Sequence, residues 1–252
     1  MATHPTRLKT LSYIFSALLL APAAALAGES VTYDVDGERF EGYFAPAQGE
    51  SRGGVLLMHD WDGLTGYEEK RADMLAELGY DTFAIDLYGQ GNRPAEVDAR
   101  KEETAKLYDD RERMRTLTLA GLEQAREQGL DEVVVMGYCF GGAVILEQAR
   151  SGEADNIQGY ASFHGSLGTP EGQSYPEDTP PLLIAHGGAD SSVSLDDVAT
   201  LAGELEEAGA TYQIEIYSGA PHAFTVFDGD RYQERADILS WNAFTAFLER
   251  QL

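Results

Sequence analysis

The sequence predicts an α/β fold with three αβα layers, in which a mainly parallel central sheet lies between two layers of helices. Short apolar runs bounded by turn residues alternate with helical patterns along residues 28–252. No internal repeat, low-complexity tract or Pro/Gly/Ser-rich linker divides this stretch. The 252-residue chain is 43% apolar, which is enough for one large core. We therefore expect a single domain over residues 28–252.

The elements follow from the period of the apolar residues. Two runs predict a first hairpin, Val31–Val35 and Arg39–Ala45. Short apolar runs predict buried strands at Gly54–His59, Asp81–Asp86, Glu132–Gly137, Ile157–His164, Leu182–His186 and Thr211–Tyr217. Helical spacing predicts helices at Tyr67–Leu78, Val97–Glu127 (more than one helix), Gly142–Arg150, Leu195–Ala208 and Asp230–Leu252. Since ligands bind beyond the carboxyl ends of parallel strands, functional residues are expected just after the apolar runs.

The first 27 residues differ from the rest of the chain. His4, Arg7 and Lys9 precede the apolar run Leu11–Ala25, which ends in the small-residue pattern Ala25-Leu26-Ala27. We interpret residues 1–27 as a secretory signal peptide, cleaved near Ala27/Gly28, and expect the mature protein to be exported to the periplasm or secreted. No later segment approaches the ~20 apolar residues of a spanning helix, so we expect no stable membrane insertion.

The charge balance excludes one class of partner. The chain has 18 Lys and Arg against 43 Asp and Glu, a formal net charge of -25, which opposes binding to nucleic acid. The acidic residues are spread along the chain, as on a well-solvated exterior. We expect a monomer, with a dimer as the alternative.

The strongest motif surrounds the only cysteine. Four apolar residues, Val133–Met136, lead into Gly137-Tyr138-Cys139-Phe140-Gly141-Gly142, with Cys139 at the apex of a tight turn before a helix. Side chains at 137 and 141 would collide with the neighbouring helix and strand. The pattern predicts a nucleophile elbow that carries sulfur, and the helix N-terminus is expected to lower the thiol pKa toward neutrality. The alternative is a small buried hydrophobic residue.

Such an elbow predicts an acid after a later strand and a histidine after the last one. Asp190 follows the strand Leu182–His186 and a glycine turn, and His222 follows the strand that ends at Tyr217. His222 would accept the thiol proton, and Asp190 would orient its ring. Taken singly, Asp190 could instead cap the next helix, as could Ser194 or Asp196, and His222 could simply be exposed.

Three further histidines end predicted strands, and we expect none of them to be the base. These are His59, His164 and His186.

A second loop is expected at the end of the first central strand. In hydrolases with an elbow this loop supplies an oxyanion donor, so the backbone N–H groups of Trp61 and Phe140 are the candidates. Asp60 lies beside them in sequence, and a carboxylate near a thiol opposes ionisation of the thiol. Alternatively, Asp60 caps the following turn.

No cofactor is expected. The chain lacks His-Glu-x-x-His, Cys-x-x-Cys, paired histidines at helical spacing, Gly-x-Gly-x-x-Gly and a Walker lysine motif, so neither a metal nor a nucleotide is indicated. It also lacks Gly-x-Ser-x-Gly, so a serine nucleophile is not expected.

Residues 30–250 resemble the dienelactone hydrolase family (carboxymethylenebutenolidases), which are α/β-hydrolases with a Cys-His-Asp triad. The resemblance is carried by four short segments, Gly-Tyr-Cys-Phe-Gly-Gly at 137–142, Asp-Leu-Tyr-Gly at 86–89, His-Gly-Gly-Ala-Asp at 186–190 and Pro-His-Ala-Phe at 221–224. It implies that Cys139 is the nucleophile, Asp190 the orienting acid and His222 the base.

The chain departs from the family at two places. The family usually has Glu, the resting-state partner of the cysteine, at the position of Asp60, where the side chain here is one methylene shorter. Its best-known members bind a substrate carboxylate through arginines, one of them a few residues beyond the catalytic histidine, whereas residues 223–227 contain none. Tyr88 and Arg93, in and after the Asp-Leu-Tyr-Gly stretch, are the remaining candidates for substrate binding.

The sequence thus predicts an exported hydrolase that cleaves activated carboxylic esters or lactones, small-molecule substrates, through a thioester on Cys139. The alternative is a catalytically idle α/β-hydrolase fold that binds a small molecule or reacts with thiols.

Overall fold

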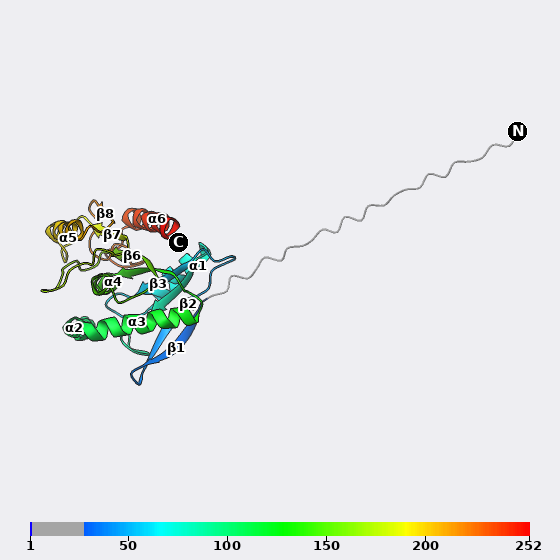
Figure 1. Cartoon of the computed structure of the whole chain (residues 1–252), viewed down its shortest axis with the longest axis horizontal. Coiled ribbons are helices and arrows are strands. Elements are labelled where there is room, and N and C mark those ends of the chain that lie inside the picture. Colours follow the sequence, from blue (N-terminus) through cyan, green and yellow to red (C-terminus); the bar gives the residue numbers. More distant parts are fainter. Residues whose placement is uncertain (2–27) are drawn as a thin grey trace.

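The chain forms one eight-stranded sheet. We describe it from a computed structural model, which covers residue 1 and residues 28–252; the predicted signal peptide lies outside the described residues. The strand order is β1-β2-β4-β3-β5-β6-β7-β8, which runs from bottom to top in Figure 1. The strands are β1 Glu29–Val35, β2 Glu38–Ala45, β3 Gly54–Met58, β4 Asp81–Ile85, β5 Val133–Tyr138, β6 Ile157–Phe163, β7 Leu182–Gly187 and β8 Tyr212–Tyr217.

The pairing of the strands is mostly parallel, as predicted. β1 and β2 form the expected antiparallel hairpin, β2 also pairs antiparallel with β4, and all other pairs are parallel. Met58 at the end of β3 lies opposite Gly137 near the end of β5. The loops after β3 and β5 therefore start next to each other, at the carboxyl edge where the sequence placed the chemistry.

Helices cover both faces of the sheet (Figure 1). Their bounds are α1 Gly66–Glu77, α2 Val97–Asp109, α3 Arg111–Glu127, α4 Phe140–Ser151, α5 Leu195–Ala208 and α6 Glu234–Gln251. Alternate residues of β3 pack on opposite sides: Leu56 and Met58 join the core beneath α3, α4 and α5, whereas Val55 and Leu57 join the core beneath α1 and α6. This arrangement is the predicted three-layer α/β fold.

The long helical pattern Val97–Glu127 divides into two helices, as expected, and Asp110 marks the break. Its backbone lies at φ -122° and ψ 79°, outside the helical region, and its side chain accepts a hydrogen bond from the N–H of Arg113. Asp110 therefore ends α2 and caps α3.

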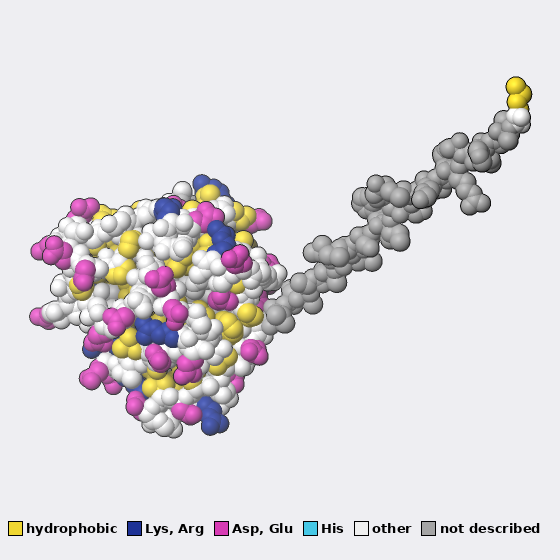
Figure 2. Space-filling model, turned by 45° about the vertical axis from the view of Figure 1, so that its right-hand side comes forward, with side chains coloured by type: hydrophobic (Ala, Val, Ile, Leu, Met, Phe, Trp, Pro, Cys, Tyr) yellow, Lys and Arg dark blue, Asp and Glu magenta, His cyan; other side chains and the backbone are white. Residues whose placement is uncertain are grey.

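Acidic side chains are scattered over the face seen in Figure 2 and do not gather in one patch there. Within the described part of the chain, no helix combines the length and the apolar character that a membrane span requires.

The turn between β5 and α4 is tightly constrained. Cys139 lies at φ 50° and ψ -109°, a conformation that L-residues rarely adopt. A Cβ at Gly137 would come within 2.3 Å of the backbone of Gly141, and a Cβ at Gly141 would come within 2.5 Å of the carbonyl oxygen of Met58. The predicted collisions are confirmed, and the two glycines let α4 approach the ends of β3 and β5.

We predict that Gly141→Ala destabilises the protein by about 1–3 kcal/mol, because its Cβ meets rigid backbone at the end of β3. Urea unfolding followed by circular dichroism measures this loss. The matched control is Gly203→Ala in α5, where nothing lies within 4 Å of an added Cβ. There alanine should stabilise the helix by about 0.5–1 kcal/mol. Equal midpoints for Gly141→Ala and the unsubstituted protein would contradict this account of the turn.

Candidate active site

Cys139, His222 and Asp190 lie in hydrogen-bonding contact. The Nε2 atom of His222 is 3.1 Å from the sulfur of Cys139, and its Nδ1 atom is 2.8 Å from Oδ2 of Asp190. The three residues come from the turn after β5, the loop after β7 and the loop after β8. The structure thus brings together the three side chains that the sequence suggested as nucleophile, base and acid.

Asp190 holds the imidazole from one side. Its side chain is fully buried, and besides His222 it accepts hydrogen bonds from the backbone N–H groups of Ser192 and Val193 at 2.8 and 3.0 Å. Burial opposes ionisation, but the hydrogen bonds from His222, Val193 and Ser192 outweigh it and lower the pKa of Asp190 below its usual value. An ionised Asp190 can hold a proton on Nδ1 of His222, which leaves Nε2 to face the sulfur. Ser194, which was an alternative cap, is the N-cap of α5.

A cavity of about 430 Å³ opens beside the sulfur. Cys139 and His222 line it, with apolar groups contributed by Trp61, Ala223 and Val226. The remaining lining residues are Asp60, Asp62, Arg100, Ser192, Gly229, Asp230 and Arg231. Cys139 is partly exposed to this space, so a small molecule that enters the cavity can reach the thiol.

The expected lowering of the thiol pKa is wrong for the free protein. Burial of the sulfur raises the pKa of Cys139 to about 12, and Asp60, when ionised, adds to this effect. The N–H of Phe140 at the start of α4 lowers the thiol pKa, as expected, but this effect is smaller than that of burial. Cys139 is therefore a protonated thiol at neutral pH, and it needs a base to ionise.

The loop after β3 forms one wall of the cavity and carries Asp60 and Trp61. Asp60 accepts a hydrogen bond from the N–H of Asp62 at 3.0 Å, so it caps the following turn and also faces the cavity. Tyr88 does not line the cavity; its hydroxyl donates to the carbonyl oxygen of Trp61 at 3.3 Å and so supports this wall from behind.

Glu68, which the sequence analysis missed, fixes the same loop. Its carboxylate accepts the N–H of Asp60 at 3.2 Å and both the N–H and the hydroxyl of Thr65 at 2.8 Å. Thr65 and Glu68 form a capping box at the start of α1. The Thr-x-x-Glu pattern at residues 65–68 is typical of a capping box and could have indicated this role of Glu68.

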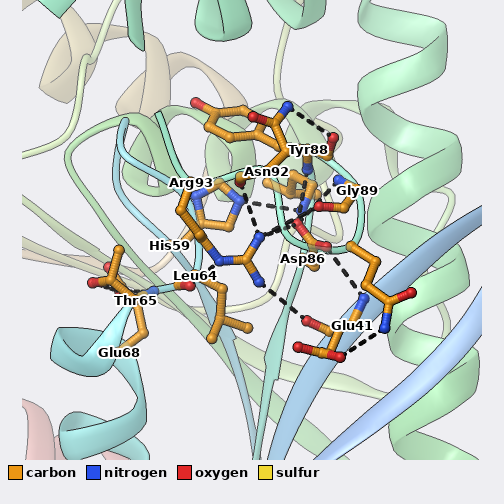
Figure 3. Close-up of polar contacts among 12 residues, drawn as sticks. Glu41, His59, Leu64, Thr65, Glu68, Asp86, Tyr88, Gly89, Asn92 and Arg93 are labelled. Carbon is orange, nitrogen blue, oxygen red and sulfur yellow. Dashed lines mark hydrogen bonds and ion pairs between the residues drawn. The ribbon is translucent and has the colours of Figure 1, made fainter. Parts of the chain in front are cut away.

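Arg93 does not reach the cavity. Its guanidinium group donates to the carbonyl oxygens of Leu64, Asn92 and three other acceptors around it, as Figure 3 shows. Arg93, a sequence candidate for substrate binding, is thus held by neighbouring acceptors and does not line this cavity. Two other arginines line the cavity instead, Arg100 from α2 and Arg231 from the loop before α6.

The other histidines of residues 28–252 make no hydrogen bond to the sulfur, although the ring of His164 packs edge-on against that of His222, with the ring centroids 5.3 Å apart. His59 accepts the N–H of Leu87 at 3.1 Å, and His164 contacts the hydroxyl of Thr225 at 2.8 Å. Burial lowers the pKa of both rings, so they are neutral at pH 7. His222 is the imidazole whose ring contacts the sulfur.

Comparison with known proteins shows the family of the chain. The sequence model of the dienelactone hydrolase family matches residues 40–252. The chain belongs to the dienelactone hydrolase family. It is accordingly a hydrolase of carboxylic esters or lactones. The alternative of a catalytically idle fold that binds a small molecule or reacts with thiols is not favoured.

Two relatives are carboxymethylenebutenolidases. The enzyme of Rhodococcus opacus is 26% identical over 215 residues, covering 79% of this chain and 81% of that protein. The enzyme of Pseudomonas putida is 27% identical over 194 residues, covering 74% of this chain and 80% of that protein.

Solved structures of the dienelactone hydrolase type share the fold. The crystal structure of a dienelactone hydrolase-like promiscuous phosphotriesterase from metagenomic libraries superposes with a TM-score of 0.80 at 25% identity. The match covers 89% of this chain and 98% of that one.

We predict that alkylation of Cys139 by iodoacetamide speeds up continuously between pH 6 and pH 9. The raised pKa of the thiol keeps the thiolate fraction small, so each unit of pH increases that fraction about tenfold. The rate is measured by mass spectrometry, and the same chain unfolded in guanidinium, whose thiol should level off above its ordinary pKa of about 8.5, is the control. A plateau below pH 7 would reveal a preformed thiolate and contradict the prediction.

Proposed function

We propose that this protein is an exported cysteine hydrolase that cleaves activated carboxylic esters and lactones through a thioester on Cys139. The observation that carries the proposal is the position of the His222 ring, with one nitrogen against the sulfur and the other against Asp190. This is the arrangement that nucleophilic acyl transfer requires.

In the first half of the reaction, Nε2 of His222 takes the thiol proton and the thiolate attacks the substrate carbonyl carbon. The backbone N–H groups of Phe140 and Trp61 would donate to the oxyanion. The C–O bond of the ester then breaks, and the departing oxygen takes the proton from the imidazolium. The products of this half are an alcohol, or the ring-opened hydroxyl of a lactone, and an acyl group on sulfur.

In the second half, His222 takes a proton from water, and the resulting hydroxide adds to the thioester carbonyl. The C–S bond breaks, the thiolate recovers the proton from His222, and the carboxylic acid leaves. Asp190 keeps the ring oriented in both halves through its contact with Nδ1.

The sulfur nucleophile favours some substrates over others. Because a thiolate is itself a good leaving group, the tetrahedral adduct goes forward only when the departing oxygen is comparably stable. Enol esters, aryl esters and thioesters should therefore react faster than alkyl esters and amides.

Asp60 is proposed as the resting-state partner of Cys139. Both residues line the cavity, and Asp60 raises the pKa of the thiol whenever it is ionised. A substrate that displaces or screens this charge would favour thiolate formation when it binds.

We predict that Cys139→Ala lowers the rate of p-nitrophenyl acetate hydrolysis by about a thousandfold or more, because the remaining groups cannot form the acyl intermediate. His222→Ala should cause a comparable loss, since no base then ionises the thiol. Rates equal to that of the unsubstituted protein in the Cys139→Ala variant would refute the proposal.

The proposed role of Asp190 as the orienting acid is tested with a matched control variant. Asp190→Asn should lower kcat strongly, whereas Asp196→Asn, which removes an exposed carboxylate from the first turn of α5, should leave kcat within about twofold. Circular dichroism establishes that each variant is folded before its kinetics are compared.

Export is tested separately. We predict that expression of the full chain in a Gram-negative host yields a periplasmic or secreted protein whose N-terminus is Gly28 or a close neighbour. N-terminal sequencing and cell fractionation give the answer, and an uncleaved chain retained in the cytoplasm would contradict the signal-peptide prediction.

A further inference from the structure

Two buried carboxylates, Asp60 and Glu68, lie next to each other at the wall of the cavity. They are 6% and 0% exposed, and one carboxylate oxygen of each lies within 4.8 Å of the other and of one carboxylate oxygen of Asp62. Three acidic groups alone do not define a metal site, and we assign none to them. Two carboxylates at this separation in buried surroundings resist joint ionisation, so the pair holds one proton over part of the pH range.

The two partners are not equally able to carry the negative charge. Glu68 accepts three hydrogen bonds, one from Asp60 and two from Thr65, and it lies in the first turn of α1, where the helix dipole favours an anion. Asp60 accepts one, from the N–H of Asp62. The charge is therefore better stabilised on Glu68, and the proton on Asp60.

We propose that Glu68 is a positioning residue that keeps the negative charge of this pair away from the sulfur, so that Asp60 is protonated when Cys139 ionises. This inference rests on the proposed nucleophilic role of Cys139. Asp60 lines the cavity together with Cys139, whereas Glu68 does not. Glu68, on α1, thus affects the ionisation of a thiol that lies on a different element.

The electrostatics of the two groups support the proposal. Burial raises the pKa of Glu68 to about 7 and raises the pKa of Asp60 well above its usual value, with the neighbouring carboxylates adding to both effects. An ionised Asp60 raises the pKa of the Cys139 thiol. The thiolate is thus easier to form while Asp60 carries its proton.

Other ionisable groups surround Asp60 from several elements. Arg100 of α2 pairs with Asp62 at 3.6 Å, and the ring of His59 is held by the loop after β4. The further groups that face the pair or the cavity are Tyr88, Cys139, His222, Asp230 and Arg231.

The test is a double-mutant cycle on thiol reactivity. Iodoacetamide alkylation of Cys139 at pH 7 is measured in the unsubstituted protein, Glu68→Gln, Asp60→Asn and the double variant. Without the charge of Glu68, Asp60 ionises, so Glu68→Gln should react about three- to tenfold more slowly, equivalent to a thiol pKa higher by about half to one unit. In the double variant position 60 cannot ionise, and the rate should return to within about twofold of Asp60→Asn.

Two outcomes would overturn the proposal. One is an unchanged rate in Glu68→Gln, and the other is a loss that persists in the double variant, which would mean that Glu68 only supports the loop. The matched control is Glu69→Gln, which removes the same charge from the adjacent position of α1 and should leave the rate unchanged.

A second measurement needs no substitution at Glu68. The unsubstituted protein and Asp60→Asn should be alkylated at the same rate at the acidic end of the pH profile, where Asp60 is neutral, and Asp60→Asn should be faster at higher pH, once Asp60 ionises. A constant ratio above one at every pH would show that Asp60 is always charged, against the proposal. Alkylation requires no ester turnover. The alkylation results therefore test the role of Glu68 even if Cys139→Ala leaves hydrolysis intact, which would refute the proposed function.

Discussion

The backbone of Cys139, at φ 50° and ψ -109°, is the constraint on which the site depends. A residue held in such a conformation costs about 1–3 kcal/mol, and the surrounding structure must supply that energy. Here the glycines at 137 and 141 let α4 press against β3 and β5, and the N–H of Cys139 is held by the carbonyl oxygen of Phe163 at 3.0 Å. The sulfur is thereby fixed at the start of α4, within 3.1 Å of an imidazole 83 residues further along the chain.

Because of this placement, the Cys139 thiol is not permanently ionised, and its ionisation depends on its surroundings. Burial and acidic neighbours oppose the thiolate, while the N–H of Phe140 and the guanidinium of Arg231 favour it. The sum leaves a protonated thiol in the free protein. Ionisation then requires His222 and a change of environment when substrate enters, so the reactive anion forms where its target is bound. A thiol kept in this state is also less exposed to adventitious oxidation, which depends on thiolate character.

Much of the architecture could be predicted because local chemistry dictates it. The apolar runs match the strands to within a residue or two, since both faces of the sheet are covered by helices, and Cys139, Asp190 and His222 follow strands whose order fixes where they meet. The position of a side chain relative to residues distant in the sequence could not be predicted in this way. Arg93 looked available from its position after β4, but the structure surrounds it with carbonyl oxygens. Arg231 lies within the predicted last helix, but α6 begins only at Glu234, so Arg231 reaches the cavity from a loop. The thiol pKa was misjudged because the helix dipole is visible in the sequence, whereas the degree of burial is not.

The central claim is that acyl groups pass through the sulfur of Cys139, and trapping the intermediate tests it most directly. The protein is mixed with p-nitrophenyl acetate, quenched in acid during turnover, digested and analysed by mass spectrometry. The account predicts one acetyl group on the peptide that contains Cys139, removable by hydroxylamine at neutral pH as a thioester is, and no acetylated peptide in Cys139→Ala. An acetyl group that forms and turns over on any other residue, with Cys139 unmodified, would contradict it.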